Sequence, residues 1–268
     1  MKLITVVTHS DFYFPILKES CAKNKLELIV LGFGKKWKGF TWRFGLLKEY
    51  LSTLDPDEIV LVTDGFDVIV LHTNELLDKF HSYKTDILFS AEYVNGFLYN
   101  WINQTIYPEC HGNNLSVGAY MGKVSALLNF YENFCKLYDC SEYQLEDQRA
   151  VSKWCPNSIK LDTKGLIFYN HNLTTEYNIQ GNKILTPDTE PCIVHGAGNA
   201  NLHSIAELYG YDTSSIRQLS ITEAYAKRIP SYIKYFGYEI AILVVILFVF
   251  VFCSFWSFYK KDLNLKTH

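Results

Sequence analysis

Two carboxylates interrupt a strongly apolar stretch in the first third of the chain. Residues 59–70 read Ile-Val-Leu-Val-Thr-Asp-Gly-Phe-Asp-Val-Ile-Val, so that Asp64 and Asp67 lie between two short β-branched runs. Such runs are typical of buried strands. Because a buried carboxylate is costly unless its charge is compensated, this stretch predicts a strand, a polar turn and a second strand with a bound cation.

A hard divalent cation is the compensation that these residue types favour. Mg²⁺ and Mn²⁺ take oxygen ligands from one or two carboxylates and fill the rest of their coordination shell with phosphate. Gly65 allows a sharp bend between the two acids, and Phe66 offers a flat aromatic face. The interpretation is a metal–diphosphate site at a strand end. A strand-end turn with two solvated acids is the alternative, and the spacing alone does not separate the two.

Strands and helices alternate along the first 92 residues. This alternation predicts an α/β fold with a mostly parallel sheet and helices on both faces. We expect strands at Leu3–Thr8, Leu28–Leu31, Ile59–Thr63 and Ile87–Glu92, and helices at Phe14–Asn24, Trp42–Leu54 and Asn74–Phe80.

Residues suited to ligand binding follow four of these strands. They are Thr8, the segment Gly32–Trp37, the segment Asp64–Asp67, and Glu92. Because ligands of such sheets gather beyond the carboxyl ends of the strands, we expect these four segments to surround one site.

The pattern becomes less regular after residue 95. The aromatic and polar segment Val94–Leu115 is typical of an active-site loop, and Gln144–Trp154 is expected to be a helix with Glu146 and Asp147 near its middle. Further elements are expected at 117–128, 127–138, 159–161, 167–169 and 193–195.

The carboxyl-terminal segment predicts a membrane anchor. Ile240–Phe258 carries no charged residue, and as a helix it would reach about 28 Å, enough to cross a bilayer core. The expected organisation is a catalytic domain at 1–211, a juxtamembrane linker at 212–237, a transmembrane helix at 238–259 and a short basic tail at 260–268. Because residues 2–7 resemble a first strand rather than a secretory leader, we expect a cytosolic domain. The sequons at Asn103, Asn114 and Asn172 would matter only if the domain were lumenal.

Charge and cysteine content exclude some classes of protein. The formal net charge is −3, which gives no basic surface for nucleic acid. Seven cysteines include no Cys-x-x-Cys pair, so no zinc site is expected. We interpret Cys135 and Cys140 as buried thiols, and we expect no obligatory disulfide framework and a reducing compartment.

Six blocks, in one order and at compatible spacing, resemble the glycosyltransferase domain of procollagen lysyl hydroxylases and the related collagen glycosyltransferases. The resemblance covers roughly residues 1–210. The blocks are Gly32-x-Gly34-x-x-Trp37, Val62-Thr-Asp-Gly-Phe-Asp-Val-Ile69, Leu88-Phe-Ser-Ala-Glu92, Glu146-Asp-Gln148, Leu161-Asp162 with Ile167-Phe168, and Ile193-Val-His-Gly196-x-Gly198.

The resemblance implies a GT-A fold, a Rossmann-like mixed sheet that uses a UDP-sugar donor and Mn²⁺ or Mg²⁺. Asp64 and Asp67 would bind the metal, with His195 as the third protein ligand. A histidine that merely packs after a strand is the alternative for His195. The flanking Gly196 and Gly198 favour close approach of a ligand instead.

The same resemblance assigns the nucleotide and acceptor sides of the site. Trp37 and Phe66 would contact the uracil and Thr8 would hydrogen-bond it, although an ordinary core aromatic is the alternative for Trp37. Glu146 and Asp147 would orient acceptor hydroxyls, act as base or stabilise developing charge, with a solvated helix face as the alternative. Glu92 would contact sugar or acceptor, whereas Asp162 is interpreted as structural.

Three departures from the family pattern bear on activity. Arg43 follows a segment that is glycine-rich in relatives, and we expect it to contact phosphate. Ser116 and Asn201 stand where relatives carry an amide and a lysine, respectively. Loss of the lysine weakens leaving-group stabilisation.

Three functions are compatible with these residues. The first is a metal-dependent transferase that moves a galactose or glucose from a UDP-sugar to a hydroxyl, such as collagen-like hydroxylysine or its glycan. The second is a degenerate transferase that binds nucleotide or a partner at a membrane. The third, a phosphohydrolase, is disfavoured because Asp64 and Asp67 lack the spacing of aspartyl-phosphate enzymes. The sugar, the acceptor and the stereochemical course do not follow from the sequence.

Overall fold

The computed structural model describes residues 1–140, 146–172, 175–186, 189–198 and 200–217, together with Glu223 and residues 245–249. The chain divides into a unit of Met1–Gln218 and a unit of Leu219–His268, and the fold below is that of the first. The predicted transmembrane helix at 238–259 lies, except for residues 245–249, outside the described residues. Within the described parts, no helix combines the length and the apolar character that crossing a bilayer requires.

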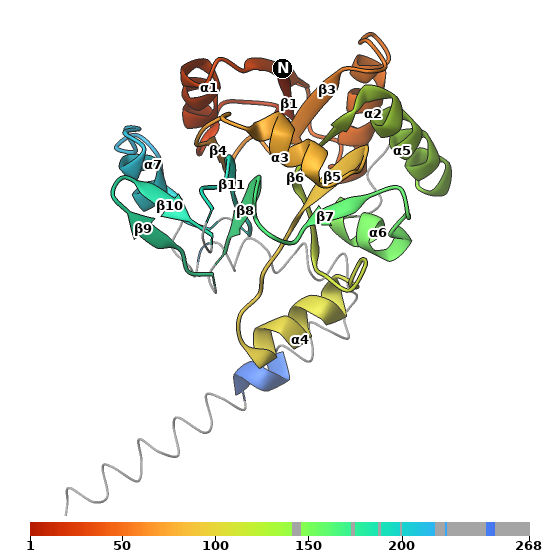
Figure 1. Ribbon diagram of the computed structural model, residues 1–268. Coiled ribbons are helices and arrows are strands. Elements are labelled where there is room, and N and C mark those ends of the chain that lie inside the picture. The colour runs from red at the N-terminus through yellow and green to blue at the C-terminus, as the bar shows by residue number, and fades with distance from the viewer. Residues whose placement is uncertain are drawn as a thin grey trace, which may run out of the picture. The chain divides into compact units, whose positions relative to one another are not determined.

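The first unit is built on a six-stranded mixed sheet with the strand order β2-β1-β3-β6-β5-β7 (Figure 1). β6 pairs antiparallel with both β3 and β5, and the other three pairings of neighbours in the sheet are parallel. The expected mostly parallel sheet is confirmed, with β6 inserted between two parallel strands. The strands are β1 (Lys2–Val6), β2 (Glu27–Leu31), β3 (Ile59–Thr63), β5 (Ile87–Ala91), β6 (Leu115–Lys123) and β7 (Lys160–Asp162).

A second sheet of three strands lies beside the first. Its order is β4-β11-β8, where β11 pairs antiparallel with β4 and parallel with β8. An antiparallel hairpin of two short strands forms a third sheet among the described residues. These strands are β4 (Val68–Val70), β8 (Phe168–His171), β9 (Asn178–Gln180), β10 (Lys183–Leu185) and β11 (Ile193–Gly196).

Helices cover both faces of the large sheet, as the alternation predicted. Residues of α2, α5 and α6 pack with Ile4, Val60 and Phe89 in one apolar cluster. Residues of α1 and α3 pack with Leu3 and Leu61, on the opposite face, in a second cluster that also holds part of the small sheet. The helices are α1 (Phe14–Lys23), α2 (Phe40–Leu51), α3 (Leu76–Ser82), α4 (Phe97–Ile106), α5 (Val124–Leu137), α6 (Asp147–Trp154) and α7 (His203–Leu208).

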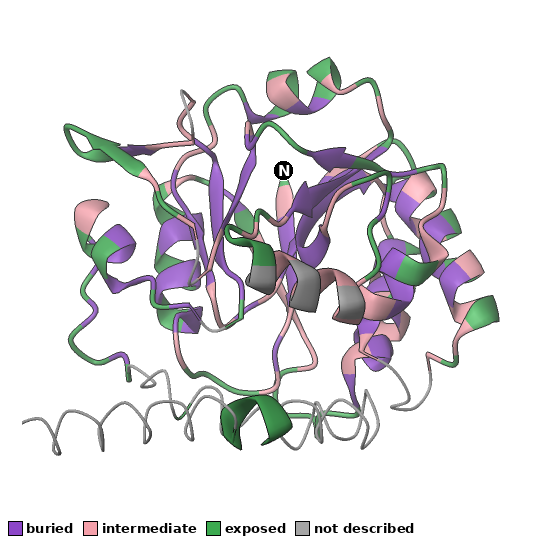
Figure 2. Ribbon diagram, turned by 90° about the horizontal axis from the view of Figure 1, so that it is seen from below, coloured by how far each residue is buried: buried purple, intermediate pink, exposed green. Residues whose placement is uncertain are grey.

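The core follows the strands of both sheets. Every residue of β5 is buried, as are the first eight residues of β6, whereas β9 is exposed along its length (Figure 2). A large sheet buried on both faces leaves its strand ends as the positions at which polar side chains reach solvent. The candidate site lies at the carboxyl ends of the parallel strands.

Two expectations about helices are corrected. The segment Val94–Leu115 was expected to be a loop, but it contains α4, whose pattern is masked in the sequence by asparagines and aromatic residues. The helix expected at Gln144–Trp154 begins at Asp147, so Glu146 is its N-cap rather than a residue near its middle. Glu146 caps the helix because its carboxylate accepts a hydrogen bond from the Arg149 amide at 2.7 Å.

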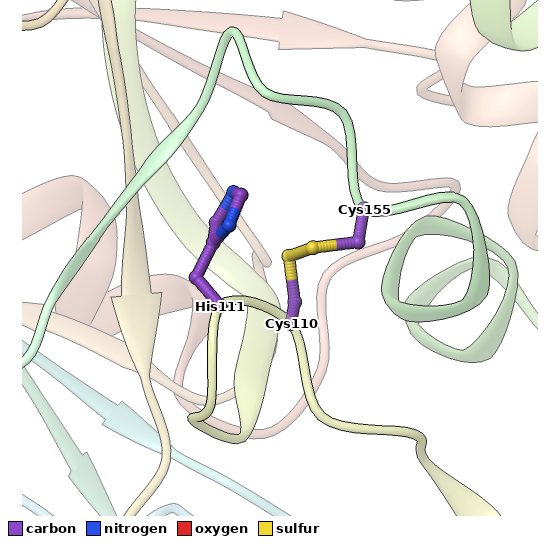
Figure 3. A group of neighbouring side chains, drawn as sticks. All are labelled: Cys110, His111 and Cys155. Carbon is purple, nitrogen blue, oxygen red and sulfur yellow. A yellow bond between two sulfur atoms is a disulfide. The ribbon is translucent and has the colours of Figure 1, made fainter.

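The expectation of no disulfide framework is wrong for the structure. Cys110 is bonded to Cys155, and Cys135 is bonded to Cys140. Figure 3 shows the first disulfide with the imidazole of His111 beside it. The ligand atoms of Cys110, His111 and Cys155 lie close enough together to hold a metal. In the structure, however, the two sulfur atoms are bonded to each other. Sequence spacing did not reveal these pairs. The first joins the segment after α4 to the end of α6, and the second needs the chain to turn back directly after α5.

The two disulfides should differ in their contribution to stability. Cys110 and Cys155 are 45 residues apart, whereas Cys135 and Cys140 are 5 apart. Loop-closure entropy then gives about 4 kcal/mol for the first and about 2 kcal/mol for the second. We expect the C110A/C155A variant to unfold at a lower urea concentration than the matched C135A/C140A variant. Equal midpoints, or four reactive thiols at these positions in the native protein, would contradict the pairing.

Candidate active site

Asp64 lies immediately after β3, at the carboxyl end of the strand. Its amide donates to the carbonyl of Gly118 in β6 at 2.8 Å, which extends the β3–β6 pairing by one residue. Gly65 comes next, and a Cβ there would lie 2.0 Å from Cγ1 of Val7. The glycine is therefore needed for close packing against the chain after β1. Its φ lies outside the left-handed region, so the predicted bend does not depend on a positive φ.

Asp67 and His195 are brought together by the small sheet. Asp67 precedes β4, and its carbonyl accepts a hydrogen bond from the Gly196 amide of β11 at 2.7 Å. His195 stands opposite Val68 in the antiparallel register of these strands. This pairing places an imidazole next to a carboxylate that is 128 positions earlier in the chain.

The three predicted metal ligands converge. Nε2 of His195 lies 3.7 Å from a carboxylate oxygen of Asp64 and 3.7 Å from one of Asp67. One ligand atom from each of the three residues lies within 4.8 Å of the other two. Oδ1 of Asp67 is buried and has no hydrogen-bond partner among the described residues. Two carboxylates and an imidazole form a donor set that fits Mn²⁺ or Mg²⁺, and a buried, unpaired carboxylate oxygen is what such a cation would satisfy.

Arg43 lies on α2 and joins this trio to a third acid, Asp147. Its guanidinium pairs with Oδ1 of Asp64, while its Nε lies 2.5 Å from Oδ2 of Asp147. Nη2 also donates to the Val117 carbonyl at 3.2 Å. The side chain is buried, so it compensates two carboxylates in a region that water does not screen. The guanidinium that we expected to contact phosphate is directed at two carboxylates, and its contact with phosphate stays a prediction.

The acid pair Glu146 and Asp147 lies at the amino terminus of α6. Asp147 is 2% exposed, which removes the alternative of a solvated helix face. Its Oδ1 accepts from the Gln148 amide at 2.9 Å. Burial raises the pKa of Glu146 to about 8, and the adjacent charge of Asp147 adds to the rise. Burial also raises the pKa of Asp147, against the opposing charge of Arg43.

The raised pKa of Glu146 makes stability depend on pH. The folded state holds this proton up to about pH 8, whereas the unfolded chain releases it near 4.5. The free energy of unfolding should therefore fall as pH rises through this window, and the change E146Q should remove that part of the fall. We expect the free energy of unfolding of E146Q, minus that of the native chain, to grow from pH 4.5 to 8 and then level off. Urea titrations in the presence of chelator measure this difference. The exposed Glu49→Gln variant is the matched control, and parallel pH profiles for E146Q and the native chain would contradict the assignment.

Glu92 follows β5 and faces the same region. Its carboxylate oxygens lie 3.5 Å from Nε2 of Gln148 and 3.4 Å from Nδ2 of Asn172. A polar cavity of about 190 Å³ opens beside it, lined also by Asn100, Glu109 and Asn114 among others. Glu92 thus lies between the acid-bearing end of α6 and an open space.

The residues expected on the nucleotide side form two groups. Trp37 is 39% exposed and stands edge-on to Phe40 and Trp42, so it is not an ordinary core aromatic. Phe66 packs instead against His9 and Phe12.

The other residues predicted on this side hold the loops at the strand ends. Oγ1 of Thr8 is 2.9 Å from Nδ1 of His9, and its carbonyl accepts from the Gly34 amide, which holds the Gly32–Trp37 segment at the end of β1. Gly196 allows close packing, since a Cβ there would lie 3.0 Å from the Ala200 carbonyl oxygen. Gly198 has a φ of +74°, which favours glycine.

Asp162 is structural, because its carboxylate accepts hydrogen bonds from the amides of Leu166, Ile167 and Phe168.

Two residues of the site were missed from the sequence. Gly118 lies against the imidazole, because a Cβ there would be 2.1 Å from Cε1 of His195. Asn170 is buried in β8 and its Oδ1 lies 2.7 Å from Nδ1 of His195. The available signal for Asn170 was its position as a polar residue directly after the apolar run at 166–169.

Residues 1–218 match the profile of the family described as PLOD GT domain. The chain belongs to this family. As a PLOD GT domain it is a glycosyltransferase domain, which confirms the resemblance seen in the six blocks. Among curated relatives, it is 27% identical over 230 residues to a procollagen-lysine,2-oxoglutarate 5-dioxygenase of Drosophila melanogaster. The match covers 74% of this chain and 30% of that protein.

Solved glycosyltransferase structures resemble this PLOD GT domain more distantly. One is a glycosyltransferase involved in glycosylation of the major capsid of PBCV-1, with 12% identity, a TM-score of 0.44, and coverage of 78% of this chain and 96% of that one. Another is the galactosyltransferase LgtC in complex with donor and acceptor sugar analogs, with 11% identity, a TM-score of 0.45, and coverage of 83% and 98%.

Proposed function

We propose that this chain transfers a hexose, galactose or glucose, from a UDP-sugar to a hydroxyl acceptor, with Mn²⁺ or Mg²⁺ held by Asp64, Asp67 and His195. The observation that carries the proposal is the convergence of these three side chains, together with a buried, unpaired oxygen of Asp67. The cation would neutralise the diphosphate as UDP leaves.

The other predicted residues take roles consistent with their positions. Glu92 borders the open cavity, and Gln148 links it to the end of α6 that carries Glu146 and Asp147. These three acids would orient the acceptor hydroxyl or receive its proton. Because Glu146 has a pKa of about 8, it holds a proton at neutral pH and would orient the acceptor by donating a hydrogen bond, whereas Asp147 or Glu92 would be the base. Thr8, Trp37, Phe66, Gly196 and Gly198 would line the nucleotide. The fly relative's name refers to procollagen lysine, so collagen-like hydroxylysine or its glycan is the acceptor proposed here.

A UDP-release assay on the full chain tests this function. UDP-galactose and UDP-glucose are each supplied with a hydroxylysine-bearing peptide, with and without Mn²⁺. The proposal expects UDP release that needs both the peptide and the cation, and loss of that release on chelation. Turnover that is unchanged in chelator would exclude a metal-dependent mechanism.

A second candidate is a degenerate transferase that binds nucleotide without turnover. Two departures from the family pattern favour it. Asn201 accepts a hydrogen bond from the Tyr13 hydroxyl at 3.1 Å, so this position carries a hydrogen-bonded amide in place of the expected cation. Ser116 is buried, and its hydroxyl oxygen accepts a hydrogen bond from the Gly118 amide at 3.3 Å. Thermal stabilisation by UDP and Mn²⁺, with no UDP release from any sugar nucleotide, would favour this candidate.

The cellular location is also a proposal. A single-pass membrane protein with a carboxyl-terminal anchor is the expectation from the sequence. The two disulfides support an oxidising compartment for the domain over the cytosolic placement expected above, because such bonds persist there. Protease protection of the domain in sealed microsomes tests this choice.

A further inference from the structure

Asn170 lies directly beside His195 across two parallel strands. The register of β8 and β11 pairs these two residues, and both are buried, with Asn170 1% exposed. The Asn170 side chain makes two contacts of 2.7 Å. Its Nδ2 donates to the carbonyl of Ala91 at the end of β5, and its Oδ1 faces Nδ1 of His195.

The first contact fixes the direction of the second. The Ala91 carbonyl can only accept a hydrogen bond, so the NH₂ end of the amide must point toward it. The amide oxygen is then left facing the imidazole, and an amide oxygen also only accepts. Nδ1 of His195 must therefore carry a hydrogen, whether the ring is neutral or charged. When the ring is neutral, the nitrogen without a hydrogen is Nε2.

Nε2 is the atom that faces the two site carboxylates. It lies 3.7 Å from Asp64 and 3.7 Å from Asp67. The ring is confined on another side by Gly118, where a Cβ would come within 2.1 Å of Cε1. The imidazole is thus held by the Asn170 amide at Nδ1, and the backbone of β6 at Gly118 packs against the ring.

We propose that Asn170 is a positioning residue, which keeps Nδ1 of His195 protonated and presents the unprotonated Nε2 toward Asp64 and Asp67. The value of this arrangement to metal binding rests on the proposed function, whereas the tautomer itself does not. The opposite tautomer would direct an N–H at the cation position and leave no lone pair there. Partners that orient a metal-binding histidine in this way typically contribute 10–100-fold in metal affinity.

The tautomer can be read directly by NMR on the metal-free full chain. The protein is labelled with ¹⁵N-histidine and brought to a pH at which His195 is neutral, and its ring signals are assigned by their loss in H195Q. We expect the cross-peak pattern of the Nδ1–H tautomer. An Nε2–H pattern in the native chain would overturn the proposal without any variant.

Two variants at Asn170 separate positioning from simple packing. N170A and N170D both lose the bond to Ala91, but only the aspartate still accepts the Nδ1 hydrogen. We expect N170A to lose the Nδ1–H pattern and to bind Mn²⁺ about 10–100-fold more weakly, and N170D to keep the pattern. The same pattern in N170A as in the native chain would overturn the proposal. Mn²⁺ affinity that is unchanged in H195Q would instead contradict the proposed metal site, leaving the tautomer to be decided by the NMR signals alone.

Discussion

Replacing Asp67 with asparagine should abolish Mn²⁺-dependent UDP release while the fold survives. The substitution keeps the shape of the side chain and removes one charge from the proposed cation site. A bound metal supplies several kcal/mol of transition-state stabilisation, so a loss of about 10³-fold or more is expected. The fold should tolerate the change because Oδ1 of Asp67 makes no hydrogen bond to any described residue.

Thermal melts separate loss of metal from loss of structure. In chelator, D67N should melt at or slightly above the native temperature, because removing one charge relieves repulsion with Asp64. Mn²⁺ should raise the melting temperature of the native chain but not that of D67N. The exposed Asp78→Asn change on α3 is the matched control and should behave as the native chain does. Undiminished UDP release by D67N would show that Asp67 is not a metal ligand.

Replacing Arg43 with methionine should be the most destabilising single change in the site. Its guanidinium pairs with both Asp64 and Asp147, and Asp147 is almost fully buried. Removing one partner of a buried ion pair typically costs about 3–5 kcal/mol, because the remaining charge is left uncompensated. We expect R43M to lower the free energy of unfolding by this amount, measured by urea titration at neutral pH.

Two further comparisons identify the cause of that loss. The double change R43M/D147N should recover part of the stability, since one stranded carboxylate is then neutral. Lysine at position 43 should rescue only partly, because one ammonium cannot reproduce the two-sided contact of a guanidinium. The deficit of R43M should also shrink toward acidic pH, where the carboxylates protonate. A change of less than about 0.5 kcal/mol in R43M would mean that Arg43 behaves as an ordinary surface residue.

The parts of the fold that local pattern determines were predictable. β-branched runs gave β1, β2, β3 and β5, with bounds close to those of the structure. Alternation gave helices on both faces, and the polar residues after the strands gave the edge that carries the site. Each of these follows from residues near one another in sequence.

The rest depends on contacts between distant segments. The pairing of β4 with β11 brings His195 to Asp67, and only the family resemblance pointed to it. The bridge from Arg43 to Asp147 and the support of His195 by Asn170 join different elements, and a single polar residue in an apolar run does not name its partner. α4 was missed because asparagines and aromatic residues are weak helix formers, and packing overrides that preference.

The site is most directly tested by diffraction from crystals of the protein grown with MnCl₂ and UDP, collected near the manganese absorption edge. We expect one anomalous peak within coordination distance of Asp64, Asp67 and Nε2 of His195, with the diphosphate of UDP on its open side. Density for UDP with no anomalous peak at these three residues, or a manganese peak held by other residues, would contradict it.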